Sequence, residues 1–169
     1  IITYVRKGAI THRDNLGNHG RTEAGDVQVM SAGTGIQHSE YNLEDGVTQI
    51  FQIWIIPDQS GGQPLWGARP FPKADRSGRF VPLASGIDGD AEILPIRADA
   101  RVLGATAMAG ETISYPIGSD RKAYLVPATG RVTIGDVEAK ARDGVAIADL
   151  DTITITAIED SELVLVDVA

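Results

Sequence analysis

The 169-residue sequence contains no cysteine. Disulfide bridges, zinc–thiolate sites and cysteine nucleophiles are therefore excluded from this chain. Histidine is almost as scarce, because His12, His19 and His38 are the only three and all lie in the first quarter of the sequence. Any chemistry of the chain that depends on imidazole must take place around those three positions.

Positive charge and long apolar runs are also in short supply. Lys and Arg number 15 against 23 Asp and Glu, which gives a formal net charge of −8, and no cluster of Lys and Arg offsets it. Binding to nucleic acid through phosphate neutralisation is therefore disfavoured. Apolar runs such as residues 53–56 fall far short of the roughly 18 residues of a membrane-spanning helix. We expect a soluble, cytoplasmic protein that does not contact a membrane.

The sequence also lacks an initiating methionine. It opens on Ile1 and Ile2, in a strand-like run that has none of the features of a signal peptide. We therefore expect Ile1 to be the first residue of a fragment or of a processed chain.

Helical periodicity is nearly absent, whereas short β-type runs recur and end at glycine, aspartate or asparagine. This rhythm is typical of an all-β sandwich or barrel. The runs predict strands at residues 1–5, 27–31, 49–56, 124–126, 132–134, 145–148, 152–157 and 163–168. A turn is expected at residues 14–18, and Gly135-Asp136 predicts a tight hairpin.

A segment rich in proline and glycine divides the chain. Residues 57–90 hold five of the eight prolines, together with apolar side chains that could dock on a neighbouring surface. We expect an N-terminal domain over residues 1–57, a connector over 58–90 and a C-terminal domain over 91–169.

The two halves resemble one another. In the first half, Gly8 and then Gly25 each precede a β-type run. In the second half, Gly130 and then Gly144 do the same. Two similar β units favour a duplicated jelly-roll-like barrel.

The motif with the most chemical content is His38-Ser39-Glu40. Residues i and i+2 of a strand point to the same face, so His38 and Glu40 would converge. An imidazole and a carboxylate suit iron, manganese, nickel or zinc, although an ion needs three or four such ligands. The alternative is a solvated His–Glu pair with no ligand role. His12 and His19 have charged or Gly and Asn neighbours, and we expect both at the surface.

Four segments of the sequence resemble the pirin family of the cupin superfamily. They make a dense match over residues 1–57 that is specific to pirins rather than to cupins in general. The segments are Thr3-Tyr4-Val5 with Gly8, His12 to Asn18, Gly25 to Glu40, and Gln52-Ile53-Trp54. Residues 120–169 are similar to the C-terminal cupin of the bacterial quercetinase-like pirins.

The resemblance implies a bicupin fold of two jelly-roll-like β-barrels joined by the Pro/Gly-rich connector. In this family one metal ion, commonly iron, is held in the N-terminal barrel by three histidines and a glutamate. His38 and Glu40 match the family's His-x-Glu residue by residue. The family's other pair, a His-x-His, has no counterpart here and is expected just before Ile1. A complete iron(II) site is therefore expected only if residues before Ile1 supply that pair.

The C-terminal barrel is expected to be structural, because no histidine follows position 38. When the two halves are aligned with Gly25 matched to Gly144, His38 is matched to Ala157 and Glu40 to Glu159. In the N-terminal barrel, period-2 alternation suggests members of the 52–54 strand as inward-facing residues.

The resemblance implies two different functions. One is a quercetin 2,3-dioxygenase-like reaction, in which metal and O2 cleave the heterocyclic ring of a flavonol and release carbon monoxide. In that reaction Glu40 would be both a metal ligand and the acceptor of the hydroxyl proton. The other is a metal-binding regulatory module that contacts a protein partner without turnover. A metal-free remnant retained for its shape is a third interpretation.

Overall fold

The computed structural model describes residues 1–90 and 93–169. In this part of the chain strands follow one another through short turns, and the single helix is the 3-10 turn η1 (Lys73–Arg76). The all-β prediction is confirmed. The described residues include no helix with the length and apolar character that crossing a membrane requires.

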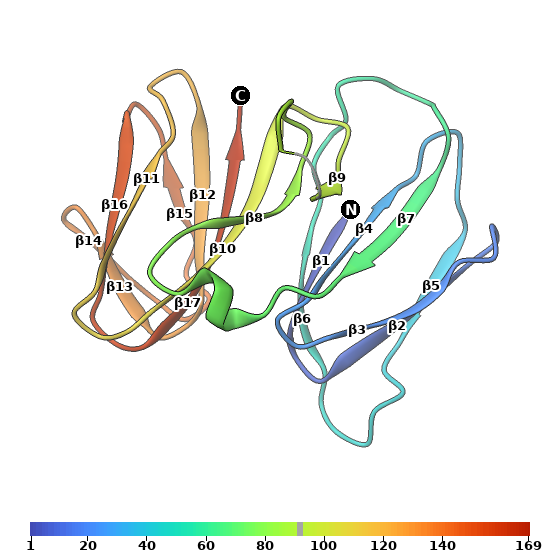
Figure 1. Cartoon of the computed structure of the whole chain (residues 1–169), viewed down its shortest axis with the longest axis horizontal. Helices are drawn as coiled ribbons and strands as arrows, with labels where there is room; N and C mark the ends of the chain where they lie inside the picture. The colour runs from blue at the N-terminus through green and yellow to red at the C-terminus, as the bar shows by residue number, and fades with distance from the viewer. Residues whose placement is uncertain (91–92) are drawn as a thin grey trace. The chain divides into compact units, whose positions relative to one another are not determined.

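The strands form two compact units (Figure 1). Unit 1 consists of Ile1–Pro72 and the described part of 91–98, and unit 2 consists of Lys73–Asp90 and Asp99–Ala169. Residues 58–90, expected as a connector, contribute strand β7 (Leu65–Arg69) to unit 1 and η1 and β8 (Val81–Ser85) to unit 2.

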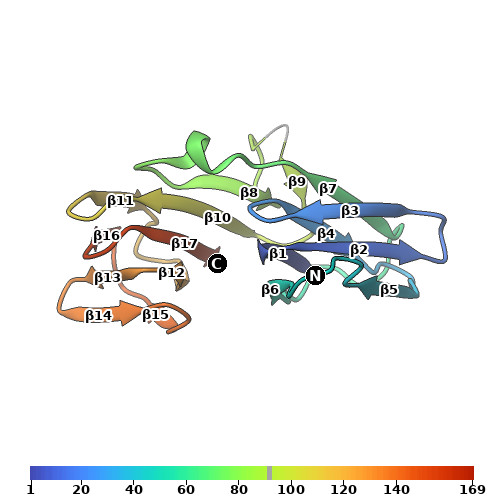
Figure 2. The ribbon, with the colours of Figure 1, turned by 90° about the horizontal axis from the view of Figure 1, so that it is seen from below.

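Unit 1 is built from two antiparallel sheets. The first has the order β6-β1-β4-β7, with β1 (Ile2–Lys7), β4 (Val27–Ser31) and β6 (Gln49–Ile53). The second has the order β3-β2-β5, with β2 (Ala9–Asp14), β3 (His19–Glu23) and β5 (His38–Tyr41). Figure 2 shows β5 and β6 at one margin of the unit and β3 and β7 at the other. The short β9 (Leu94–Pro95) lies beside β4 and β7.

Unit 2 also has two antiparallel sheets. Its larger sheet has the order β15-β12-β17-β10-β8, with β10 (Ala100–Ala107), β12 (Lys122–Thr129), β15 (Val145–Ile147) and β17 (Ser161–Val168). The other has the order β11-β16-β13-β14, with β11 (Thr112–Pro116), β13 (Arg131–Ile134), β14 (Val137–Lys140) and β16 (Thr152–Ala157). In Figure 2, β14 and β15 lie at one margin of this unit and β8 and β11 at the other.

The alternating sequence of β16 shows how unit 2 forms its core. Ile153 and Ile155 are 0% and 1% exposed. The threonines of the same strand take the opposite face, where Thr156 shares a 2.9 Å hydrogen bond with the Thr112 hydroxyl of β11. The inward residues of both sheets join one apolar cluster that includes Leu125, Leu163 and Leu165. The space between the two sheets of unit 2 is therefore occupied by apolar side chains.

The predicted repeat is confirmed by the strand pairing. In unit 1, β1 pairs with β4 and β6, while β2 pairs with β3 and β5. In unit 2, β12 pairs with β15 and β17, while β13 pairs with β14 and β16. Gly8 and Gly130 stand at the matching β1–β2 and β12–β13 turns with φ of 71° and 79°, a left-handed conformation that glycine adopts without strain.

Candidate functional site

Polar side chains meet between the two sheets of unit 1. Gln28 on β4 and Gln52 on β6 both donate hydrogen bonds across the barrel to the carboxylate of Glu40 on β5. Thr22 on β3 donates in turn to the carbonyl oxygen of Gln28 at 3.2 Å, and both of these side chains are buried. Unit 1 therefore has a polar network between its sheets, which is buried at Gln28 and exposed at Gln52, whereas the sheets of unit 2 enclose an apolar core.

His38 and Glu40 are brought to this network by one strand. They stand two residues apart on β5, and β5 pairs with β2 so that Glu40 lies opposite His12 and His38 lies opposite Asp14. The His38 ring is stacked on the ring of His12, with 5.7 Å between the centroids and 23° between the planes. The role of His38 and Glu40 as metal ligands stays a prediction.

His12 is buried, so its expected position at the surface was wrong. Only 1% of it is exposed, because its ring is stacked on the ring of Trp66, which stands on β7 of the other sheet, with 4.8 Å between the centroids. His12 Nε2 lies 3.0 Å from Asp14 Oδ2. The sequence could not show this because Trp66 comes from a distant strand. His19 is exposed, as predicted.

Asp14 organises the turn that follows β2. Its Oδ1 accepts hydrogen bonds from the backbone N–H groups of Leu16 and Asn18, and its Oδ2 accepts from the Asn18 side chain at 2.8 Å. Burial alone would raise the pKa of the Asp14 carboxyl, but the hydrogen bonds from His12, Asn18 and Leu16 outweigh it and lower the pKa to about 2. The carboxylate is therefore ionised at neutral pH and can only accept, which assigns the Nε2 hydrogen to His12.

The lowered pKa predicts acid sensitivity of this turn. Because the folded pKa lies below the unfolded value of 3.8, the stabilisation is present above about pH 4 and is lost as the pH falls toward 2. NMR titration of the Asp14 carboxyl carbon should give a midpoint near 2, with the Asn18 amide signal moving in parallel. In Asp14→Asn this step should vanish, while a midpoint near 4 in the unaltered chain would contradict the hydrogen-bond network.

The described residues fit one half of a metal site. An imidazole and a carboxylate on one face of β5 are ligands of suitable chemistry for a divalent transition metal. His12 Nε2 is not free to ligate an ion, because its hydrogen is directed at Asp14. Within residues 1–90 and 93–169, no three His, Asp or Glu side chains are arranged to hold an ion. His38 and Glu40 are therefore two side chains of suitable chemistry, and no third ligand is arranged beside them in the described part of the chain.

Unit 2 has isoleucines in place of the site. His12 is the fourth residue after the turn glycine Gly8, and it lies opposite Glu40 on the neighbouring strand. In unit 2 the fourth residue after Gly130 is Ile134, and it lies opposite Ile155. The counterpart of His38 is then Ile153, two residues earlier. The expected counterparts Ala157 and Glu159 were wrong, because Ile153 follows Gly144 by 9 residues whereas His38 follows Gly25 by 13.

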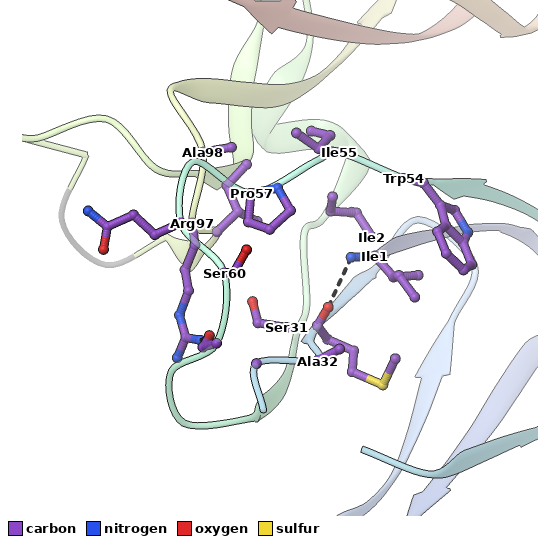
Figure 3. Close-up of a pocket in the computed structure, with 15 residues that line it drawn as sticks. Ile1, Ile2, Ser31, Ala32, Trp54, Ile55, Pro57, Ser60, Arg97 and Ala98 are labelled. Carbon is purple, nitrogen blue, oxygen red and sulfur yellow. Dashed lines mark hydrogen bonds between the residues drawn. The ribbon is translucent and has the colours of Figure 1, made fainter. Parts of the chain in front are cut away.

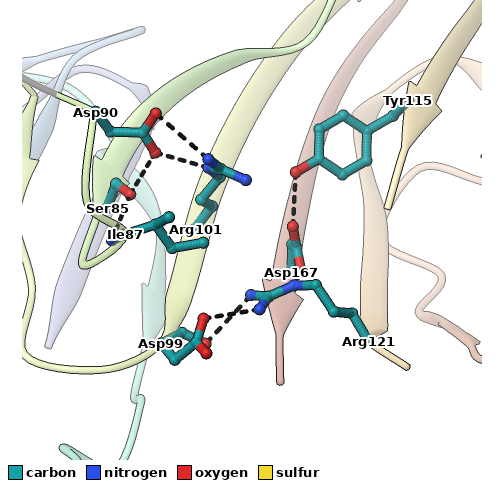
Figure 4. Close-up of polar contacts among 8 residues, drawn as sticks. All are labelled: Ser85, Ile87, Asp90, Asp99, Arg101, Tyr115, Arg121 and Asp167. Atoms are coloured by element: carbon teal, nitrogen blue, oxygen red, sulfur yellow. Dashed lines mark hydrogen bonds and ion pairs between the residues drawn. The ribbon is translucent and has the colours of Figure 1, made fainter. Parts of the chain in front are cut away.

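Charged groups in unit 2 are bound to one another (Figure 4). The buried carboxylate of Asp167 accepts hydrogen bonds from the Tyr115 hydroxyl and from Arg121 Nε, each at 2.6 Å, and Arg121 also pairs with Asp99 at 2.7 Å. Burial, together with the hydrogen bond to Asp167, raises the pKa of Tyr115 to about 12. These side chains serve as structural cross-links between strands.

A cavity of about 360 Å³ opens in unit 1 (Figure 3). Its wall is mainly apolar and includes Met30, Trp54, Ile55 and Pro57. Trp54 links the cavity to the network, because its Nε1 donates to the Gln52 carbonyl oxygen at 3.0 Å. The volume lies in the range of small-molecule sites.

Comparison with known proteins decides the family. The Pirin family model matches residues 1–55, and the model for the quercetinase C-terminal cupin domain matches residues 83–168. A "Pirin-like protein" of Caulobacter vibrioides is 68% identical over the whole chain, which covers 73% of that protein. This chain belongs to the pirin family.

Other pirin relatives carry more specific names. A protein of Escherichia coli K12 named "Quercetin 2,3-dioxygenase" is 36% identical over 99% of this chain, which covers 71% of that protein. The crystal structure of the bacterial pirin YhhW from E. coli in complex with nickel(II) has a TM-score of 0.89 and 34% identity, with 99% of this chain and 71% of that chain covered. The bicupin prediction is confirmed by this likeness and by the two family models.

Proposed function

We propose that this pirin is a metal-dependent dioxygenase that cleaves the heterocyclic ring of a flavonol such as quercetin with O2. The observation that carries the proposal is the placement of the exposed His38 and the half-buried Glu40 on one face of β5, where Glu40 joins the polar network of unit 1. The E. coli relative named as a quercetin 2,3-dioxygenase supports the same activity. We propose iron(II) as the metal, with the family's His-x-His pair as the remaining ligands.

Different side chains of unit 1 would bind the metal, accept the proton and contact the substrate. A bound divalent metal supplies Lewis acidity toward a substrate oxygen. Glu40 would act as a ligand and would accept the proton of the flavonol hydroxyl at one carboxylate oxygen. Trp54 and its apolar neighbours at the cavity offer a flat surface of the kind that aromatic rings bind.

The test is turnover by the purified full-length gene product after loading with iron(II). We expect O2 uptake, loss of the flavonol absorption band and release of carbon monoxide in equal amounts. The variant to compare with the unaltered protein is Glu40→Gln, because it preserves side-chain size and removes both the charge and the proton acceptor. Equal turnover by this variant would contradict the proposed role of Glu40.

The alternative is a metal-binding regulatory module without turnover. It is favoured by apolar side chains exposed at and after the end of β5, since Tyr41, Leu43 and Val47 are 44%, 64% and 65% exposed. Stoichiometric metal with no O2 uptake would support this alternative. Absence of both metal and turnover would support a metal-free remnant.

A further inference from the structure

Both oxygens of the Glu40 carboxylate are held by amide groups. Gln28 Nε2 donates to Oε1, and Gln52 Nε2 donates to Oε2 at 3.2 Å. The two glutamines stand on β4 and β6, on either side of β1, and both lie opposite Thr3. The carboxylate is thus held from two strands of the sheet that faces β5.

Each glutamine is itself fixed by a hydrogen bond at its carbonyl oxygen. The Thr22 hydroxyl donates to Gln28 at 3.2 Å, and Trp54 Nε1 donates to Gln52 at 3.0 Å. Because an indole N–H can only donate, the Gln52 carbonyl must face Trp54 and its NH2 group must face Glu40. Gln28 is only 3% exposed, so water competes little for its amide.

We propose that Gln28 and Gln52 are positioning residues that clamp the Glu40 carboxylate for the reaction of unit 1, an inference whose catalytic part rests on the proposed function. A side-chain amide does not lose a proton at ordinary pH, so both glutamines remain hydrogen-bond donors to Glu40 throughout that range. Each carboxylate oxygen accepts one amide hydrogen bond and keeps further acceptor capacity for a ligand or a proton. The clamp therefore fixes the direction of Glu40 without using up its chemistry.

The first test measures the melting temperature of metal-free variants in which the amide donor of residue 28 and the carboxylate acceptor of residue 40 are removed or exchanged. Gln28→Met and Gln28→Glu should each lower the melting temperature by about 4 °C or more, because one removes the hydrogen bond and the other sets two carboxylates together. Adding Glu40→Gln to Gln28→Glu restores a donor–acceptor pair and should recover most of that loss. No recovery in the double variant would overturn the clamp.

The second test measures affinity for Ni²⁺ in the full-length gene product by calorimetry. Gln28→Met and Gln52→Met should each weaken binding about 10- to 100-fold, as perturbing the support of a metal ligand does. The exposed Gln49 lies on β6 with Gln52, so Gln49→Met is the matched control and should bind Ni²⁺ as the unaltered protein does.

The two tests separate the possible failures. Unchanged Ni²⁺ affinity in both clamp variants would overturn the positioning role while leaving the proposed function standing. If the unaltered protein binds no Ni²⁺ and turns over no flavonol, the proposed function fails, and the melting temperatures still decide whether the clamp exists. If Gln28→Met does not fold, Gln52→Met provides the same comparison from the exposed side of the carboxylate.

Discussion

His38→Ala is expected to lower the metal content of the full-length gene product 10- to 100-fold or more and to abolish the flavonol cleavage proposed above. The change removes one of the two candidate ligands of β5, and Glu40 as the remaining ligand of that strand would hold a transition metal more weakly. Elemental analysis of protein purified under identical conditions measures the effect, with O2 uptake recorded on the same samples.

His19→Ala is the matched control for this experiment. His19 is also an exposed histidine at the start of a strand, but it stands on β3 and takes no part in the network around Glu40. Its metal content should be unchanged. Equal metal in His38→Ala and in the unaltered protein would remove His38 from the site.

Ile155→Glu is expected to destabilise the protein by about 3–5 kcal/mol. It places in unit 2 the side chain that unit 1 carries at the equivalent position, where Ile155 is 1% exposed and surrounded by hydrocarbon. In unit 1 the carboxylate of Glu40 is met by two amides, whereas the core of unit 2 leaves a charge unpaired. Urea denaturation monitored by circular dichroism measures the loss.

The pH dependence of that loss is a further check on its cause. Burial raises the pKa of the introduced carboxyl above its unfolded value of about 4.3, so the folded state binds the proton more tightly. The destabilisation should therefore shrink as the pH falls toward 4. Ile155→Val should cost only about 0.5–1.5 kcal/mol at every pH. If Ile155→Glu costs no more than Ile155→Val, the core position assigned to Ile155 is wrong.

Local patterning was sufficient for much of the fold. The period-2 run of β16 and the Gly135-Asp136 hairpin between β13 and β14 were predicted because each depends on residues adjacent in sequence. Strand β10 was missed, since its alanines and glycine weaken the β-type signal while its burial in the sheet of unit 2 stabilises it. The 49–56 run was predicted too long, because pairing with β1 ends at Ile53.

The site divides in the same way. His38 and Glu40 could be chosen from sequence because one strand carries both, two residues apart. The 52–54 strand that carries Gln52 could be suggested as inward-facing from its alternation, but Gln28 was missed. A glutamine within the apolar β4 segment Val-Gln-Val-Met is a signal that a polar partner lies opposite it.

The sequence by itself determined the two β units, the turn at Asp14 and the confinement of imidazole chemistry to unit 1. Only the tertiary structure decided that His12 is buried between Trp66 and His38, that Glu40 is held from β4 and β6, and that isoleucines replace the pair in unit 2. The physical reason is that periodicity specifies which face a side chain takes within its own strand. The partner across the barrel depends on loop lengths and sheet register, which local sequence does not specify.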